Sequence, residues 1–138
     1  MSIDHEHDPV NAISEVEATG RTAEIFADIR EVMQIPLVTS IWRTLDAVDG
    51  GLEFTWTATR PIFQSGYADA LLEKLRSSWD LPIPNPLNAQ QLNKAGISDN
   101  DRDSILSILD AYNRSNTLNL IALTALVRPS NRSRPPEP

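Results

Sequence analysis

Asn116 interrupts an apolar pattern near the C-terminal end of the chain and is the residue best placed to do chemistry. Residues around it recur at alternating four- and three-residue steps, which places them on one face of an α-helix. This Asn116 stripe consists of Ile105, Leu109, Tyr112, Asn116, Leu120, Leu123 and Val127. A carboxamide buried on an apolar face costs free energy unless it is hydrogen-bonded. The pattern therefore predicts that a partner side chain, an ordered water or a ligand meets Asn116.

Asn116 also has a purely structural interpretation. A single polar residue in an apolar helical seam often fixes register and oligomeric state, at some cost in stability. Asn113 lies one turn earlier and could help to line the same cavity, although an asparagine in a helix is more often solvated. The residues alone leave both interpretations open.

A second set of candidate residues follows Pro36 and suits a carboxylate ligand. Thr39 and Ser40 combine hydroxyl groups with the free amides of a helix N-terminus, which favours anions, although simple capping explains them equally well. The guanidinium of Arg43 could bind a carboxylate through two parallel hydrogen bonds. The alternative for Arg43 is a surface ion pair with Asp46, three residues later.

Four aromatic residues could form the wall of a pocket for an alkyl group or a halide. They are Trp42, Phe54, Trp56 and Phe63. Aromatic side chains at such positions more often belong to the hydrophobic core.

Several kinds of chemistry are excluded by the residues that the chain lacks. There is no cysteine, so disulfides, thiol nucleophiles and thiolate metal sites are ruled out. The two histidines are His5 and His7, too close to the N-terminus to build a Ser-His-Asp set. The run from His5 to Asp8 resembles a metal site only superficially, because it has no fixed geometry. We therefore expect no metal and no cofactor.

Charge and length limit the partners and the organisation. The net charge of −7 over 138 residues argues against nucleic acid and anionic membranes, which attract basic patches. No apolar run approaches the roughly 20 residues of a membrane span, and the first residues do not resemble a signal peptide. We expect a cytoplasmic protein with one domain at 16–128, between disordered tails at 1–15 and 129–138.

The periodicity predicts an all-α fold, a compact bundle of about six helices. The helices are expected at 22–34, 36–49, 52–63, 66–79, 88–96 and 99–127. Pro36 would open the second helix, and Gly50-Gly51 would end it. The third segment alternates like a strand, but we predict a helix because a single strand would have no partner. The last helix opens with Ser98 and Asp101 as a capping box and could break near Asn113.

Four short motifs occur in an order and spacing that resemble one repeat of the group I 2-haloacid dehalogenases. These enzymes are all-helical and cofactor-independent, and they accept both enantiomers of their substrates. The motifs are Phe26-Ala27-Asp28-Ile29-Arg30, Ile35-Pro36-Leu37-Val38, Trp42-Arg43-Thr44-Leu45 and Ala111-Tyr112-Asn113-Arg114-Ser115-Asn116. Members of the family carry two diverged repeats that fold as a pseudo-dimer. The resemblance therefore implies that this chain forms a homodimer.

The resemblance also implies a reaction. In the family, an aspartate of one repeat activates a water that attacks the halogen-bearing carbon directly and inverts it. An asparagine of the other repeat helps to hold that water, and the match falls on Asn116. The ligand would be a short 2-halocarboxylic acid, bound by Thr39, Ser40 and Arg43 and lined by Trp42, Tyr112 and Asn113.

The sequence departs from the family at the catalytic aspartate. Alignment through Trp42-Arg43-Thr44-Leu45 places Ile41 at that position, and an isoleucine cannot accept a proton from water. Two functions are thus compatible with the residues. One is hydrolysis of a carbon–halogen bond with a different base. The other is a catalytically silent homodimer that binds a small carboxylate or a protein partner.

Overall fold

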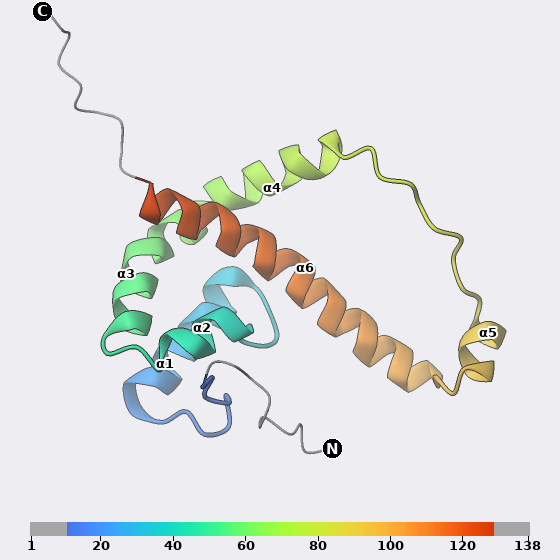
Figure 1. Cartoon of the computed structure of the whole chain (residues 1–138), viewed down its shortest axis with the longest axis horizontal. Helices are drawn as coiled ribbons and strands as arrows, with labels where there is room; N and C mark the ends of the chain where they lie inside the picture. The colour runs from blue at the N-terminus through green and yellow to red at the C-terminus, as the bar shows by residue number, and fades with distance from the viewer. Residues whose placement is uncertain (1–10, 129–138) are drawn as a thin grey trace, which may run out of the picture.

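The computed structural model describes residues 11–128 and is entirely helical over that range (Figure 1). Six helices follow one another in this part of the chain: α1 (Gly20–Met33), α2 (Ser40–Leu45), α3 (Gly51–Gln64), α4 (Tyr67–Ser78), α5 (Ala89–Lys94) and α6 (Asp99–Val127). The predicted all-α class is confirmed. The expected tail at 129–138 and most of the one at 1–15 lie outside the described residues.

α6 is the longest helix, and its C-terminal half crosses the other helices of the body (Figure 1). α3 packs against α1, α2, α4 and α6, and α4 also packs against α6. The connection from α4 to α5 loops away from the rest of the chain, and the N-terminal half of α6 extends toward α5 (Figure 1). Every residue from 99 to 110 is exposed. The body therefore gathers on the C-terminal half of α6, and the N-terminal half projects as an arm.

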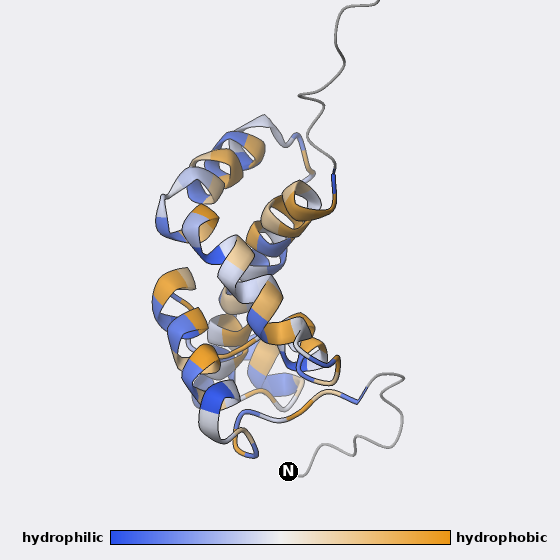
Figure 2. Cartoon of the chain, turned by 90° about the vertical axis from the view of Figure 1, so that its left-hand side faces the viewer, coloured by the Kyte–Doolittle hydropathy of each residue, from blue (hydrophilic) through white to orange (hydrophobic). Residues whose placement is uncertain are grey.

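The core is built from amphipathic helices, along which apolar residues alternate with polar ones (Figure 2). An aromatic cluster lies at its centre. Trp42 meets Trp56 edge-on with ring centroids 5.4 Å apart, and Trp56 stacks on Phe63 at 5.7 Å. The prediction that these aromatic residues belong to the core is confirmed. It is wrong for Phe54, which is exposed on α3.

α2 begins later than predicted, and its buried face is not the one that the helical spacing of Leu37, Ile41, Leu45 and Val48 predicts. Pro36 does not open a helix, because α2 begins only at Ser40, after an N-cap residue, Thr39, whose backbone is extended with φ of −71° and ψ of 157°. The amide of Val38 donates to the carboxylate of Glu15 at 2.8 Å, so its hydrogen bond is made outside any helix. From this start, Trp42 is the residue of α2 that turns inward, and Ile41 remains exposed.

α6 also buries a face other than the predicted one. The inward residues are Ala111, Ser115, Leu118, Asn119 and Ala122. Four residues of the Asn116 stripe, Ile105, Leu109, Leu120 and Val127, are instead 43–75% exposed. Small side chains such as Ala111 and Ala122 allow α6 to approach the body closely, which the larger stripe residues would prevent. The expected break near Asn113 is absent, since α6 is continuous.

Other local predictions are confirmed. Segment 52–63 is helical despite its alternating pattern, and Pro61 is accommodated near the end of α3. Ser98 and Asp101 form the expected capping box at the start of α6. The prediction that Gly50-Gly51 ends the second helix is wrong, because α2 ends at Leu45 and Gly51 is already the first residue of α3. Gly50 has φ of 67°, and a Cβ on Gly51 would lie only 2.9 Å from the carbonyl oxygen of Leu45.

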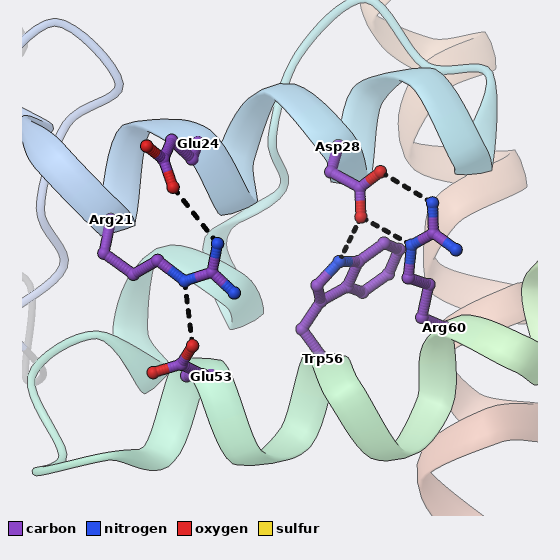
Figure 3. A network of polar contacts seen from close by, with 6 residues as sticks. All are labelled: Arg21, Glu24, Asp28, Glu53, Trp56 and Arg60. Carbon is purple, nitrogen blue, oxygen red and sulfur yellow. Dashed lines mark hydrogen bonds and ion pairs between the residues drawn. The ribbon is translucent and has the colours of Figure 1, made fainter.

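A polar network joins α1 to α3 (Figure 3). The carboxylate of Asp28 accepts two hydrogen bonds from Arg60, at 2.7 and 3.0 Å, and one from the indole of Trp56 at 2.7 Å. Arg60, and to a smaller extent Trp56, hold the pKa of Asp28 below its usual value. Asp28, which belongs to the first motif, thus serves to join two helices.

Replacing Asp28 by asparagine is expected to lower the free energy of unfolding by about 1–2 kcal/mol near neutral pH, less than a buried pair would cost because the carboxylate is partly solvated. A lowered pKa contributes stability above the unfolded value, about 3.9, which is lost as pH falls through the folded value. The difference between wild type and variant should therefore shrink below about pH 4. Urea unfolding of both proteins at pH 7 and pH 3 measures the difference in free energy of unfolding. A difference of equal size at the two pH values would contradict a charge effect.

Candidate functional site

Four buried polar side chains connect α2 to α6, and we call them the amide cluster: Thr39, Trp42, Ser115 and Asn119. The hydroxyls of Thr39 and Ser115 are 2.8 Å apart. The indole of Trp42 donates to the side-chain oxygen of Asn119 at 3.1 Å, and the Asn119 amide donates to Ser115 at 3.1 Å. In the described part of the chain no buried side-chain nitrogen or oxygen lacks a partner. The cluster is a satisfied polar contact inside the core.

Thr39 and Trp42 were expected at a carboxylate pocket, and the structure places both in this cluster, almost fully buried. The hydroxyl of Thr39 is engaged by Ser115, and the indole of Trp42 by Asn119. The cluster thereby fixes the start of α2 against the middle of α6. Asn119, rather than Asn116, is the asparagine whose buried amide is met by polar partners.

Ser40 and Arg43 lie apart from the cluster. Ser40 is exposed at the start of α2. Arg43 donates to the backbone carbonyl of Ile13 at 3.4 Å, and Asp46 accepts a hydrogen bond from Thr22 at 2.7 Å. The surface pair between Arg43 and Asp46 that the spacing allowed is therefore not formed, because each side chain has a different partner.

The remaining predicted residues come together on the other side of α6. Tyr112, Asn113 and Asn116 line a surface hollow of about 260 Å³, the α4–α6 hollow. Arg76 and Trp79, from the end of α4, complete the wall together with Thr117. The three α6 residues of one motif thus line the same hollow as two residues from the end of α4.

Arg76 and Trp79 had no distinguishing signal in the sequence. Their placement depends on where α4 ends. Trp79 is the C-cap of that helix and has an extended backbone, with φ of −76° and ψ of 124°. An aromatic residue just before a proline-rich connection was the only available hint that the indole would be left at the surface.

The lining of the hollow is rich in hydrogen-bond donors. Its lining offers a guanidinium, an indole N–H, two carboxamides and two hydroxyls, and none of its residues is acidic. This is notable in a protein with a net charge of −7. Ile41, which the sequence resemblance aligns with a catalytic aspartate, is not among the lining residues. Within one chain, the structure does not bring Ile41 and Asn116 together in one hollow.

Neither metal ligands nor a membrane span were found in the part of the chain that the structure describes. Residues 11–128 contain no group of three or more acidic, histidine or cysteine residues that could hold a metal ion. The run from His5 to Asp8 lies outside them. Over the same residues, no helix combines the length and the apolar character that crossing a bilayer requires.

Comparison with known proteins points to one group of enzymes. No protein-family model matches the chain, and no solved structure gives a significant match. A configuration-inverting 2-haloacid dehalogenase of Alcaligenes xylosoxydans xylosoxydans is 28% identical over 115 residues, which cover 83% of this chain and 39% of that enzyme. An (R)-2-haloacid dehalogenase of Pseudomonas putida is 23% identical over 111 residues, covering 76% of this chain and 37% of the enzyme.

A third relative, a configuration-inverting 2-haloacid dehalogenase of Pseudomonas sp. (strain 113), is 24% identical over 110 residues, or 79% of this chain and 36% of the enzyme. The chain thus spans less than two-fifths of the length of each of these relatives. Over most of its own length, it is distantly similar to 2-haloacid dehalogenases.

Proposed function

We propose that the chain binds a short 2-halocarboxylic acid and hydrolyses its carbon–halogen bond by direct attack of water, with inversion. The similarity over 83% of the chain to an enzyme described as configuration-inverting carries this proposal. Direct displacement by water inverts the carbon, whereas two successive displacements through a covalent ester would retain its configuration. The exposed position of Asn116 in the α4–α6 hollow supports it, because a ligand can reach the carboxamide there.

In this reaction the water oxygen forms a bond to C2 as the carbon–halogen bond breaks. The halide leaves with the bonding electron pair, and the water loses a proton. Asn116 would orient the water through its carboxamide, and orientation alone can lower a barrier substantially. Ile41 cannot accept the proton, so solvent water would take it. Because a positioned base typically contributes 10²–10⁴-fold, we expect slow turnover.

We propose that the working unit is a homodimer formed on the Asn116 stripe. The stripe exposes large apolar side chains, and a second exposed apolar group follows α4: Trp79, Leu81, Ile83 and Leu87. Exposed large apolar side chains gathered along one helix mark interaction sites. A second copy related by a two-fold axis would cover the stripe on both chains. It would also close the α4–α6 hollow, since Tyr112 and Asn116 belong to both.

Halide release and molar mass, measured on the same purified protein, test this proposal. We expect a mass twice the 15.3 kDa of one chain in light scattering. We also expect chloride or bromide release from racemic 2-chloropropionate and 2-bromopropionate above the no-protein rate. Asn116→Ala should abolish the release while leaving the helical circular dichroism unchanged, because Asn116 is exposed.

Leu120→Asp provides the test of the dimer. It places a charge in the middle of the stripe, and we expect a monomer that no longer releases halide. Asp103→Asn, a second exposed change on α6, is the control and should keep both mass and activity. A monomeric wild type would contradict the dimer, and release that persists in Asn116→Ala would remove this residue from the reaction.

A further inference from the structure

We infer that the α4–α6 hollow is a carboxylate-binding site in which Arg76 anchors the acid group and Trp79 covers the rest of the ligand. The inference deepens the proposed function, on which it rests for the choice of ligand. Neither Arg76 nor Trp79 belongs to the motifs of the sequence resemblance. The hollow of about 260 Å³ is large enough for a three-carbon acid with one halogen.

The charge around the hollow favours an anion. Arg76 is the only charged residue in its lining within the described part of the chain, and the other lining groups are neutral. Asn113 and Asn116 lie three residues apart on α6, so both carboxamides fall on the same side of the helix. A guanidinium fork with amide donors opposite matches the two oxygens of a carboxylate.

Arg76 is free to take a ligand, because its contact within the chain is weak. Its guanidinium lies 3.4 Å from the carboxylate of Glu73, and both side chains are exposed. Strong charge-assisted hydrogen bonds are about 2.7–2.9 Å long, and exposed pairs contribute little. Arg114 offers a contrast, since it lies 2.6 Å from Asp69 and donates to the carbonyl of Met33 at 2.9 Å.

Trp79 supplies the apolar part of the site. It is 53% exposed, whereas Trp42 and Trp56 are at most 4% exposed. The face of an indole suits an alkyl chain or a polarisable halogen, and its N–H can donate to an acid oxygen. The extended backbone at Trp79 holds the indole ring at the end of α4, one turn after Arg76.

Trp79 also provides the measurement. Because the other two tryptophans are buried, fluorescence changes on ligand addition should come mainly from Trp79. Full-length protein would be titrated with 2-chloropropionate, propionate and the neutral propionamide. We expect both acids to bind, with propionamide at least 10-fold weaker. Arg76→Gln should weaken acid binding at least 10-fold, and Arg76→Lys should retain part of it. Trp79→Phe should remove the signal.

Arg102→Gln is the matched control, since it removes the same charge from an exposed arginine. This residue lies on α6, 14 positions before Asn116, about 21 Å away along the helix axis. Its affinities should equal those of wild type. Equal weakening in Arg102→Gln and Arg76→Gln would show a general charge effect and overturn the site. The site would also be overturned if the acids and the amide bound equally well, or if wild-type protein showed no saturable binding of either acid.

The outcomes also separate this inference from the proposed reaction. Carboxylate binding that depends on Arg76 without any halide release would keep the site and remove the hydrolysis. Halide release whose KM is unchanged in Arg76→Gln would keep the hydrolysis and remove the anchor. If both hold, the KM should rise at least 10-fold in Arg76→Gln, with kcat changed less.

Discussion

Replacing Asn119 by leucine is expected to lower the free energy of unfolding by about 2–3 kcal/mol, although the two side chains have similar shapes. The carboxamide of Asn119 accepts from Trp42 and donates to Ser115 inside the core. Leucine removes both contacts and leaves the indole N–H of Trp42 buried without a partner. An unsatisfied buried donor costs about 1–3 kcal/mol, and the freed Ser115 adds to this.

Asn116→Leu is the matched control, because it is the same substitution three residues earlier on the same helix. Asn116 is exposed within one chain, and leucine is the better helix former and extends the apolar stripe of the proposed dimer, so we expect a destabilisation of no more than about 0.5 kcal/mol. Urea unfolding of both variants at one protein concentration measures the contrast. If Asn116→Leu were the more destabilising of the two, the burial of Asn119 described above would be wrong.

The contrast between these two asparagines shows what the α6 sequence could predict. The helix and its capping box at Ser98 were predictable, because the apolar spacing and the cap depend only on neighbouring residues. The buried face was not. Large apolar residues form the longer stripe, but the body packs on a face containing Ala111, Ser115 and Ala122. Close helix packing favours small residues, and a hydrophobic pattern alone gives them little weight.

α2 illustrates the same limit at a shorter range. Pro36 is well suited to a first helical turn, and nothing in the neighbouring residues indicates that it would not occupy one. The deciding contact is between Glu15 and the amide of Val38, which are 23 residues apart. A partner so distant in the chain cannot be inferred from local propensity. The same holds for Asp28, whose partner Arg60 lies 32 residues later.

The candidate site was predictable where one helix carries it. Tyr112, Asn113 and Asn116 lie within one motif, and the structure brings all three into the α4–α6 hollow. Arg76 and Trp79 reach the hollow only because α4 returns across α6 before the chain leaves it. That crossing is a tertiary contact, so neither residue could be assigned to the site from spacing. Thr39 and Trp42 are close in sequence to Ser40 and Arg43, yet both are buried in the core.

Replacing Ile41 by aspartate is expected to raise the rate of halide release by about 10²–10⁴-fold, which is the usual contribution of a positioned general base. Ile41 occupies the position that the resemblance gives to the catalytic aspartate. The substitution should be tolerated, since this side chain is 42% exposed. α2 has no acidic residue in its first turn, and a carboxylate there interacts favourably with the helix dipole.

The expected increase depends on the partner copy. Asn116 and Ile41 do not share a hollow within one chain, so the new carboxylate would act on water held by the Asn116 of a second copy. Ile41→Asp combined with Leu120→Asp should therefore be a monomer without the gain. Ile41→Asn introduces a side chain of nearly the same shape as aspartate that cannot act as a base. This variant should release halide at the wild-type rate.

Product chirality and pH dependence complete the test of Ile41→Asp. With (S)-2-chloropropionate, direct attack by water should give (R)-lactate, resolved by chiral chromatography. The rate should rise with pH through the pKa of the new carboxylate, near 3.9 if it is unperturbed, and then remain level. A folded, dimeric Ile41→Asp protein without increased release would show that the base position of the family does not correspond to residue 41. A retained product would instead require a covalent intermediate, which direct attack by water does not form.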